Sequence, residues 1–584
     1  MKTNLPAVSA GPATRRRAAS GLLAALLSCL LVLTGCSSIP LAGPVGTLAP
    51  EASNDSEDLP RFDAQPPGDG DSEESIIQGF LGAGINSADD YAAARQFLTK
   101  DFAAAWSATA QTLVVDKDPT VDELKSSKEG GTFKATLPVT RAIDANGVRT
   151  DYPQGRDMAQ DFELAKENGE WRISKAPNGI MVDRGNFEQI FSPVTLYYYT
   201  DSSYGTAVPD VRWIARRQGR AASIASALLA GPAPYLQGAL VSAFPKGAKL
   251  AQPSVPVDKD GVASVDVPEG LVAGEPDATR QRMVQQLQMA LGSLSNIHSV
   301  RLTVDQVPIT IGTEGAAPGL PQTNPTVDDT VVALENGRLV SFTEGGLQDI
   351  SGGNQLGKGA SSPSAAVSGT GYAVLTGGRT ALKSVAQDGT VTTLATGSKL
   401  LAPSYDTRSW IWTAAESKGA PIQAFKGTGG SGVALKAPWL KGVTPTSVRV
   451  SVDGSRLAMT VRDGSTDRVL IAGILRDGSG KPTGLSAAMS LTTTLNPTRV
   501  QWLDDRRVVV YRPSTSELVH VEELGLDSKQ SMWAQPLRGV GTIAIAPGSA
   551  LPVYAQNADG VYVRRSASAW ESTQYKAIDL AYRG

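Results

Sequence analysis

The chain has 584 residues, which at about 150 residues per domain predicts about three to four domains. Charged residues make up 19% of it, and 54 Lys and Arg against 57 Asp and Glu leave a net charge of −3, so no basic excess points to nucleic acid. Two histidines and two cysteines are too few for the usual His- or Cys-ligated metal site or for a disulfide framework. No metal or other cofactor is therefore predicted.

The first 36 residues have the pattern of an export signal. Three arginines at positions 15–17 precede an uncharged, leucine-rich run from Ala18 to Gly35. A run of 18 residues also reaches the lower limit of a transmembrane helix, which is the alternative. The segment Leu33-Thr34-Gly35-Cys36 resembles the bacterial lipobox, where signal peptidase cuts before a lipid-modified cysteine. We therefore predict a signal peptide over residues 1–35 and acyl chains such as palmitate on Cys36, which would hold the protein on the outer face of the cell membrane.

The segment that follows is acidic and poor in large apolar side chains. Residues 37–74 contain nine acidic residues, one basic residue and six prolines. Such a segment buries too little apolar surface to offset its ordering entropy, so residues 36–74 are predicted to be the lipidated cysteine and a disordered linker. It is either a spacer that lifts the folded part off the membrane or a linker without that role.

Residues 75–190 are predicted to form an α+β domain. Apolar residues from Ile76 to Trp106 recur at three- and four-residue intervals, which indicates two or three short helices. Strand patterns follow over residues 133–139, 147–151, 161–166 and 171–175, with turn signals between them. The segment Gly169-Glu170-Trp171-Arg172-Ile173 resembles the end of a nuclear-transport-factor-2-like (NTF2-like) domain.

Residues 191–318 are predicted to be a small α/β domain. Strand patterns over 194–198, 262–267 and 300–304 alternate with helical patterns over 224–228 and 284–294. The segments Leu228-Leu229-Ala230-Gly231-Pro232 and Phe244-Pro245-Lys246-Gly247 resemble the GerMN domain of spore germination and sporulation proteins. Three consecutive tyrosines, Tyr197 to Tyr199, either line a groove for a sugar or peptide or lie half in the core and half at its edge.

Residues 325–584 have the pattern of an all-β domain with internal repeats. The segments Ser404-Tyr405-Asp406 and Ser451-Val452-Asp453 lie 47 residues apart, and Trp502-Leu503-Asp504 follows at a similar step. Repeats of about 40 to 50 residues that contain only strands are typical of a β-propeller. The length corresponds to six or seven blades, and each Asp is predicted to cap a hairpin turn.

No motif in the sequence nominates a catalytic centre. His298 and His520 are isolated in sequence, and no Gly-x-Ser-x-Gly segment could pair a nucleophile with either. Acidic residues are numerous, but no local pattern selects a carboxylate pair for glycoside hydrolysis. We therefore predict that the protein is not an enzyme and that Cys36 is its only assignable site residue.

The order of these parts, together with Tyr91-Ala92-Ala93-Ala94-Arg95 in the first domain, resembles the actinobacterial LpqB lipoproteins over essentially the whole chain. The resemblance implies association with the MtrA/MtrB two-component system. In that system the lipoprotein would touch the extracellular domain of the sensor kinase and modulate signalling in cell-envelope and division homeostasis. The predicted function is a lipid-anchored protein-binding scaffold. The alternative is a peptidoglycan- or sugar-binding module, or a hydrolase, that uses the propeller or the GerMN-like cleft.

Overall fold

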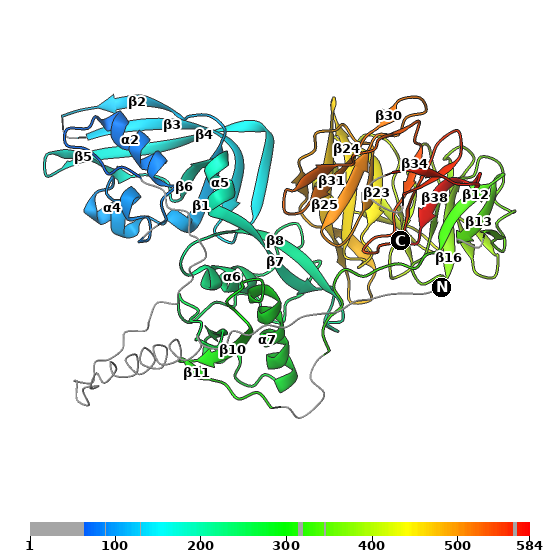
Figure 1. The fold of residues 1–584 in the computed structure, drawn as a ribbon, viewed down its shortest axis with the longest axis horizontal. Helices are drawn as coiled ribbons and strands as arrows, with labels where there is room; N and C mark the ends of the chain where they lie inside the picture. The colour runs from blue at the N-terminus through cyan, green and yellow to red at the C-terminus, as the bar shows by residue number, and fades with distance from the viewer. Residues whose placement is uncertain (1–63, 88, 129, 313–318, 344–345, 565–568) are drawn as a thin grey trace, which may run out of the picture. The chain divides into compact units, whose positions relative to one another are not determined.

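The computed structural model describes residues 64–87, 89–128, 130–312, 319–343, 346–564 and 569–584 (Figure 1). These residues belong to one compact unit, residues 55–584, and are mostly β-structure with few helices. Cys36 and the predicted signal peptide lie outside the described residues. Within the described ranges, no helix is long and apolar enough to cross a membrane.

The first part of the unit, residues 64–190, is α+β, as predicted. The Ser72 hydroxyl accepts a hydrogen bond from the Ser75 N–H group and so begins the first described helix, in which Ile76 and Phe80 face the core. The sheet has the order β5-β4-β3-β1-β6, with β2 beside β3, and only β1 and β6 pair in parallel. The elements are α2 (Glu73–Ala83), α3 (Ala92–Arg95), α4 (Lys100–Ala105), η1 (Ala108–Ala110), β1 (Gln111–Val115), β2 (Thr120–Ser126), β3 (Gly130–Asp144), β4 (Arg149–Glu167), β5 (Glu170–Lys175), β6 (Ile180–Asp183) and α5 (Arg184–Ile190).

The second part, residues 191–312, is α/β and contains two strands that were not predicted, β8 and the two-residue β11. The strand β8 (Ala207–Ala215) pairs antiparallel with β7 (Phe191–Tyr199) along its whole length. The strands β9 and β10 are parallel to each other, and β11 pairs with β10. The remaining elements are α6 (Arg220–Leu229), β9 (Val262–Asp266), η2 (Glu269–Leu271), α7 (Asp277–Leu291), β10 (Ser299–Val304) and β11 (Val307–Pro308).

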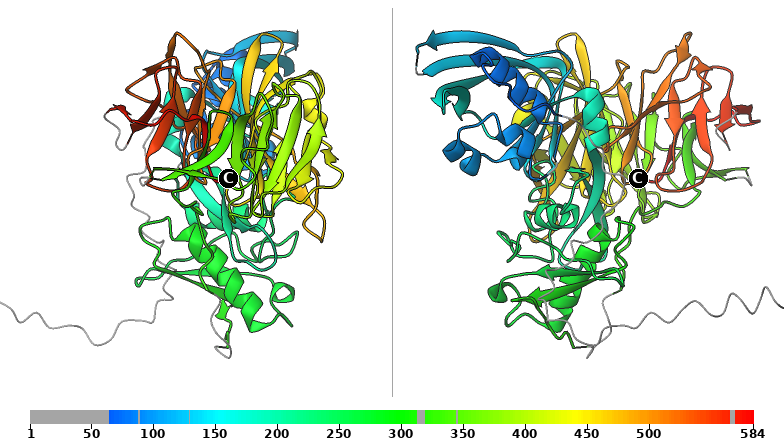
Figure 2. Two further views of the ribbon diagram at one scale, coloured as in Figure 1. Left: turned by 90° about the vertical axis from the view of Figure 1, so that its right-hand side faces the viewer. Right: turned by 60° about the vertical axis from the view of Figure 1, so that its left-hand side comes forward.

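The third part is a β-propeller with six blades in the described residues, which agrees with the lower of the two predicted blade counts. In each of five blades, all the strands come from one continuous stretch of the chain (Figure 2). Their elements are β15 (Ser361–Ala365), β16 (Gly371–Thr376), β17 (Ala381–Ala386) and β18 (Val391–Thr396); β19 (Ser404–Tyr405), β20 (Trp410–Thr413), β21 (Ile422–Lys426) and β22 (Val433–Leu435); β23 (Thr444–Val450), β24 (Arg456–Asp463), β25 (Thr466–Arg476), β26 (Pro482–Leu485) and β27 (Met489–Leu491); β28 (Arg499–Trp502), β29 (Arg507–Tyr511), β31 (Val521–Gly525) and β32 (Gln530–Met532); and β34 (Thr542–Ala544), β35 (Val553–Gln556), β36 (Val561–Arg564) and β37 (Glu571–Ser572). Short elements outside these blades are η3 (Pro438–Leu440), β30 (Leu518–Val519) and β33 (Leu537–Arg538).

The remaining blade joins the two ends of the propeller. It has the order β14-β13-β12-β38, built from β12 (Val331–Glu335), β13 (Arg338–Thr343), β14 (Gly346–Asp349) and the last strand, β38 (Ile578–Tyr582). The strands β12 and β38 pair antiparallel, and they lie side by side in Figure 1. This pairing closes the ring and leaves β38 as the innermost strand of its blade.

The repeated Asp segments occupy the same place in three successive blades. Asp406, Asp453 and Asp504 each lie in the turn between the first and second strands of a blade. Each carboxylate accepts hydrogen bonds from backbone N–H groups two to four residues later. The predicted capping of the hairpin turns is confirmed, and the period that indicated a propeller is the distance between these turns.

Candidate functional site

The residues considered from sequence do not form a common site. His298 precedes β10 and His520 lies between β30 and β31, and both side chains are exposed. Among the described residues, no group of three or more His, Cys, Asp or Glu side chains could hold a metal ion.

The three consecutive tyrosines are mainly core residues. Tyr198 and Tyr199 are buried, whereas Tyr197 is half-buried. The Tyr198 hydroxyl donates to the Leu228 carbonyl oxygen over 2.9 Å, and the Tyr199 ring packs edge-on against Tyr204. Of the two readings of this segment, the structure supports the core reading.

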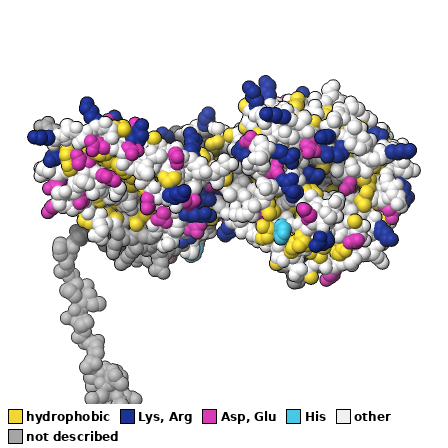
Figure 3. Space-filling model, turned by 90° about the horizontal axis from the view of Figure 1, so that it is seen from above, with side chains coloured by type: hydrophobic (Ala, Val, Ile, Leu, Met, Phe, Trp, Pro, Cys, Tyr) yellow, Lys and Arg dark blue, Asp and Glu magenta, His cyan; other side chains and the backbone are white. Residues whose placement is uncertain are grey.

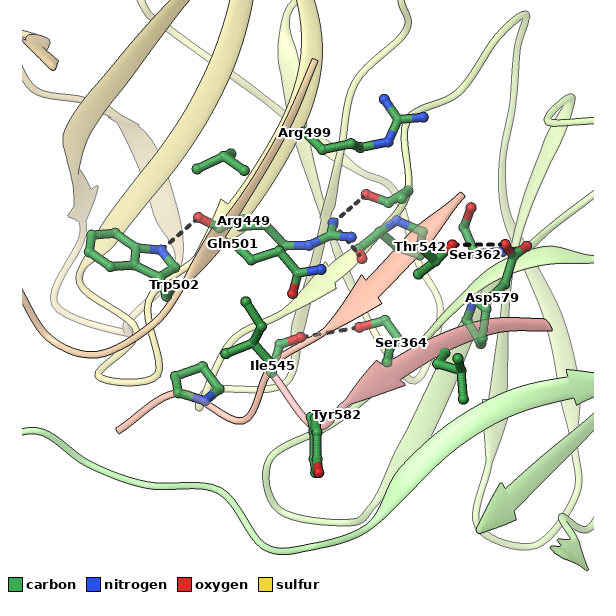
Figure 4. Close-up of a pocket in the computed structure, with 18 of the residues that line it drawn as sticks. Ser362, Ser364, Arg449, Arg499, Gln501, Trp502, Thr542, Ile545, Asp579 and Tyr582 are labelled. Atoms are coloured by element: carbon green, nitrogen blue, oxygen red, sulfur yellow. Dashed lines mark hydrogen bonds between the residues drawn. The ribbon is translucent and has the colours of Figure 1, made fainter. Parts of the chain in front are cut away.

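The described residues enclose a cavity of about 140 Å³ at the propeller axis (Figure 4). Its walls come from the inner strands β15, β23, β28, β34 and β38, which are far apart in the sequence. The labelled side chains in Figure 4 include two arginines, Arg449 and Arg499, and one carboxylate, Asp579. We take this axial cavity as the candidate site.

Arg449 carries a charge into the axial cavity without a carboxylate partner. Its Nη1 atom donates to the carbonyl oxygens of Val448, Ala402 and Pro403 at 2.9, 3.1 and 3.3 Å. Within the described ranges, no Asp or Glu side chain forms an ion pair with it, and its acceptors are all backbone carbonyl oxygens. Burial lowers the pKa of Arg449 to about 10, with Tyr511 opposing the shift and the like charge of Arg499 adding to it.

Arg499 is the equivalent residue of the next blade. The backbone N–H after each arginine donates to a serine hydroxyl of the preceding inner strand, Val450 to Ser404 over 3.0 Å and Val500 to Ser447 over 3.4 Å. Arg499 Nη1 also donates only to backbone carbonyl oxygens, those of Thr498 and Thr446. Two neighbouring blades therefore present one guanidinium group each to the same cavity.

Asp579 belongs to the other side of the ring. Its strand, β38, lies in the blade three places before that of Arg449, which is halfway around a ring of six. The Asp579 carboxylate accepts hydrogen bonds from the Ser362 N–H group at 2.8 Å and from the Thr542 hydroxyl at 3.3 Å. Its charge is thus held by its own neighbours, and it makes no ion pair with Arg449.

The composition and size of the axial cavity limit its chemistry. Guanidinium groups with free N–H donors recognise carboxylates and phosphates. Pockets that hold drug-sized ligands start at about 300 Å³, which is about twice this volume. Glycoside hydrolases commonly use two carboxylates, whereas Asp579 is the only acidic side chain in the described lining. The cavity therefore suits a small anion better than a sugar ring.

The surface is mixed in charge. Figure 3 shows Lys and Arg side chains and Asp and Glu side chains interspersed over one face of the molecule, with hydrophobic side chains scattered among them. Such a surface is ordinary for a soluble domain and does not by itself select a partner.

Three family models match successive parts of the chain. The N-terminal domain of lipoprotein LpqB matches residues 66–188, a domain described as sporulation and spore germination matches residues 195–310, and the β-propeller domain of lipoprotein LpqB matches residues 337–577. The last two matches agree with the GerMN-like and propeller predictions.

Curated relatives match over nearly the whole chain. A protein named lipoprotein LpqB from Bifidobacterium longum is 26% identical, over 90% of this chain and 89% of its own length. One of the same name from Streptomyces avermitilis is 26% identical, over 98% of this chain and 99% of its own length. Among solved structures, TolB from Acinetobacter baumannii is 14% identical with a TM-score of 0.33, over 43% of this chain and 65% of its own. On its domain matches and full-length relatives, the chain belongs to the LpqB lipoprotein family.

Proposed function

We propose that this lipoprotein is anchored through acyl chains on Cys36 to the outer face of the cell membrane and serves there as a non-enzymatic protein-binding scaffold. Its partner in this proposal is the extracellular domain of a two-component sensor kinase of the MtrB type, whose signalling it modulates. The proposed domain limits are 75–190, 191–318 and 325–584, after a linker over residues 36–74.

One observation carries the proposal: a lipobox cysteine is followed, in a single chain, by the three domains of a family whose members are named lipoproteins. A lipid anchor with two or more acyl chains holds a protein at the membrane stably. Anchoring confines both proteins to one surface, which raises the effective concentration of a weakly binding partner. The scaffold would then shift the partner's signalling equilibrium by binding one of its states more tightly than another.

The alternative, a peptidoglycan- or sugar-binding module or a hydrolase, has less support. The axial cavity is small and has a single acidic side chain in its described lining. The two histidines are exposed and belong to different parts of the chain. These observations favour binding of a protein over catalysis on a glycan.

The membrane anchor has a direct test. Replacement of Cys36 by Ala removes the only sulfur that can carry the lipid at the lipobox, so we expect loss of acylation and of cleavage before residue 36. Metabolic labelling with a fatty acid analogue, followed by mass spectrometry of the N-terminus, measures both. Cys29→Ala is the control, because Cys29 lies within the predicted signal peptide. Undiminished labelling of the Cys36→Ala protein would contradict the anchor.

The scaffold role is tested by comparing deletions with histidine substitutions. Tagged full-length protein should capture the sensor kinase from native membranes, and deletion of the propeller or of the GerMN-like domain should abolish signalling output while the anchor is kept. The double substitution His298→Ala and His520→Ala should leave output unchanged at equal protein abundance. Loss of output in the double variant would favour the enzyme reading instead.

A further inference from the structure

We infer that the axial cavity of the propeller is a binding site for a small oxyanion, a phosphate or a carboxylate, held by Arg449 and Arg499. The inference does not depend on the proposed scaffold function. It assigns a ligand class to a site for which the family matches name none.

The first argument is the hydrogen bonding of Arg449. A guanidinium group has five N–H donors, and the bonds to Val448, Ala402 and Pro403 all come from Nη1. Among the described residues, nothing accepts a hydrogen bond from its Nε or Nη2 atom. Those two atoms form one edge of the planar group, and that edge can donate two parallel bonds to the two oxygens of a carboxylate or phosphate.

The second argument is electrostatic. The charge of Arg499 acts on Arg449 as a like charge, and neither guanidinium group has a carboxylate partner among the described residues, whereas Arg456 and Arg476 of the same propeller are paired. Arg456 contacts Asp453 at 2.7 Å, and Arg476 contacts Asp406 at 2.6 Å. A desolvated cation beside a like charge is costly, and an anion between the two guanidinium groups would offset that cost.

The third argument is the arrangement around the ring. Asp579 stands halfway around the ring from Arg449, and its carboxylate is held by Ser362 and Thr542. The arginines of β23 and β28 therefore form a cationic side of the axial cavity, while the acidic group lies across from them. The two arginines and Asp579 thus line the same cavity from different blades, and no ion pair joins them among the described residues.

The site itself is built from fixed elements. The Trp502 Nε1 atom donates to the Arg449 carbonyl oxygen over 3.1 Å, and the Gln501 amide donates to the Ile543 carbonyl oxygen. The Tyr511 hydroxyl accepts from the Ile543 N–H group at 3.2 Å. These bonds join three neighbouring inner strands, β23, β28 and β34, and so fix the backbone from which the two arginine side chains extend.

The test is calorimetric titration of the full chain, in non-ionic detergent, with inorganic phosphate and separately with acetate at constant ionic strength set by sodium chloride. We expect saturable binding of at least one of the two anions and a rise in melting temperature that follows the binding isotherm. The anion that binds more tightly identifies the source of the oxyanion. If neither anion binds saturably or raises the melting temperature, the inference is wrong.

The variants assign the binding to the arginines. Arg449→Gln keeps much of the side-chain volume and removes the charge, and we expect it to weaken binding at least about tenfold. Arg499→Gln should weaken binding in the same direction. Arg538→Gln is the matched control, because Arg538 is exposed and donates to a backbone carbonyl oxygen outside the axial cavity. Binding by Arg449→Gln as tight as that of the unaltered chain would overturn the inference.

A further variant covers the case in which Arg449→Gln does not fold. Arg449→Lys keeps the positive charge and loses the planar pair of donors. Circular dichroism checks that it is folded, and we expect it to bind the anion more weakly than the unaltered chain does. Equal affinity in a folded Arg449→Lys protein would contradict the two-pronged contact and with it the assigned site.

Discussion

Tyr198 and Tyr199 are adjacent buried residues with different hydrogen bonding. The Tyr198 hydroxyl has a carbonyl acceptor, whereas the Tyr199 hydroxyl is buried without a partner among the described residues. A buried hydroxyl without a hydrogen bond costs about 1–3 kcal/mol of stability. The two residues therefore allow a buried hydroxyl with a hydrogen bond to be compared with one that lacks it, in the same strand.

We predict opposite effects from removing the two hydroxyl groups. Tyr199→Phe keeps the edge-on ring contact with Tyr204 and removes an unsatisfied polar group, so the free energy of unfolding should rise by about 1 kcal/mol. Tyr198→Phe leaves the Leu228 carbonyl oxygen without its side-chain donor and should lower it by about 1 kcal/mol. Urea unfolding of the full chain measures both, and a loss of stability in Tyr199→Phe would contradict the prediction.

Tyr199 also makes the stability of the folded protein depend on pH in the alkaline range. Burial raises the pKa of its hydroxyl from 10.0 to about 12, against the opposing effect of Arg282. Because the pKa is higher in the folded state, the unfolded chain loses this proton first as the pH rises. Stability is therefore unaffected below the unfolded pKa and falls as the pH rises from there through the folded pKa. The stability difference between the unaltered chain and Tyr199→Phe should therefore widen between pH 10 and 12. An unchanged difference across that range would show that Tyr199 does not titrate there.

At the scale of elements, the three Asp turns of the propeller differ in burial. The Asp406 side chain is fully buried, whereas that of Asp504 is 16% exposed. Besides backbone N–H groups, Asp406 accepts hydrogen bonds from the Trp412 indole at 3.0 Å and from Arg476 at 2.6 Å. The turn between β19 and β20 thus neutralises a cation that comes from β25.

We predict a correspondingly larger cost for removing Asp406. Asp406→Ala leaves the Arg476 charge and the Trp412 N–H group without their partner and should cost about 3–5 kcal/mol. Asp504→Ala removes a partner from Arg507, whose side chain is half-exposed, and should cost about 1 kcal/mol. Thermal melts of the two variants compare the turns directly. Equal losses of stability would show that burial does not determine how much each turn aspartate contributes to stability.

Sequence patterns predicted most elements but missed several strands, and in β8 the reason is that polar residues are buried. Strand β8 escaped detection because Pro209, Asp210 and Arg212 break its apolar pattern. The structure places the Asp210 and Arg212 side chains in the core as an ion pair with a 2.7 Å contact. Burial lowers the pKa of Arg212, but the charge and hydrogen bonds of Asp210, together with Tyr198 and Tyr235, raise it above its ordinary value. A local apolar count cannot foresee that two charged residues of one strand neutralise each other.

The axial cavity was missed for a different reason. Arg449 and Arg499 lie 50 residues apart, and each alternates with apolar residues as an outward-facing strand residue would. Only closure of the ring turns these positions toward a common axis. One pattern in the sequence could have identified them: an arginine occurs on the first strand of two successive repeats, about one blade period apart. Fold class and blade period were thus predictable, whereas the site depended on contacts between blades.

At the scale of the whole propeller, the ring depends on its last strand. Leu580 of β38 is 1% exposed and packs in a cluster that includes Phe342 and Tyr554, whereas Ile578 of the same strand is 44% exposed. We predict that Leu580→Ala lowers the free energy of unfolding by about 2–5 kcal/mol and that Ile578→Ala changes it by about 0.5 kcal/mol or less. Urea unfolding measures both, and limited proteolysis should detect opening of the ring in Leu580→Ala alone. Equal resistance to proteolysis would mean that β38 is not needed for closure.

Because β38 pairs with β12, the first strand of the propeller to be synthesised cannot complete its blade until the last strand has been synthesised. Until residues 578–582 have been synthesised, β12 has a free edge that can pair with other chains. Contacts between residues so far apart in sequence also form slowly, since the long intervening loop must first be closed. The domains that precede the propeller are not delayed in this way and can fold as they emerge from the ribosome. The chain is therefore most exposed to aggregation late in its biogenesis, and any factor that protects it would act on an unclosed propeller rather than on a nascent N-terminus.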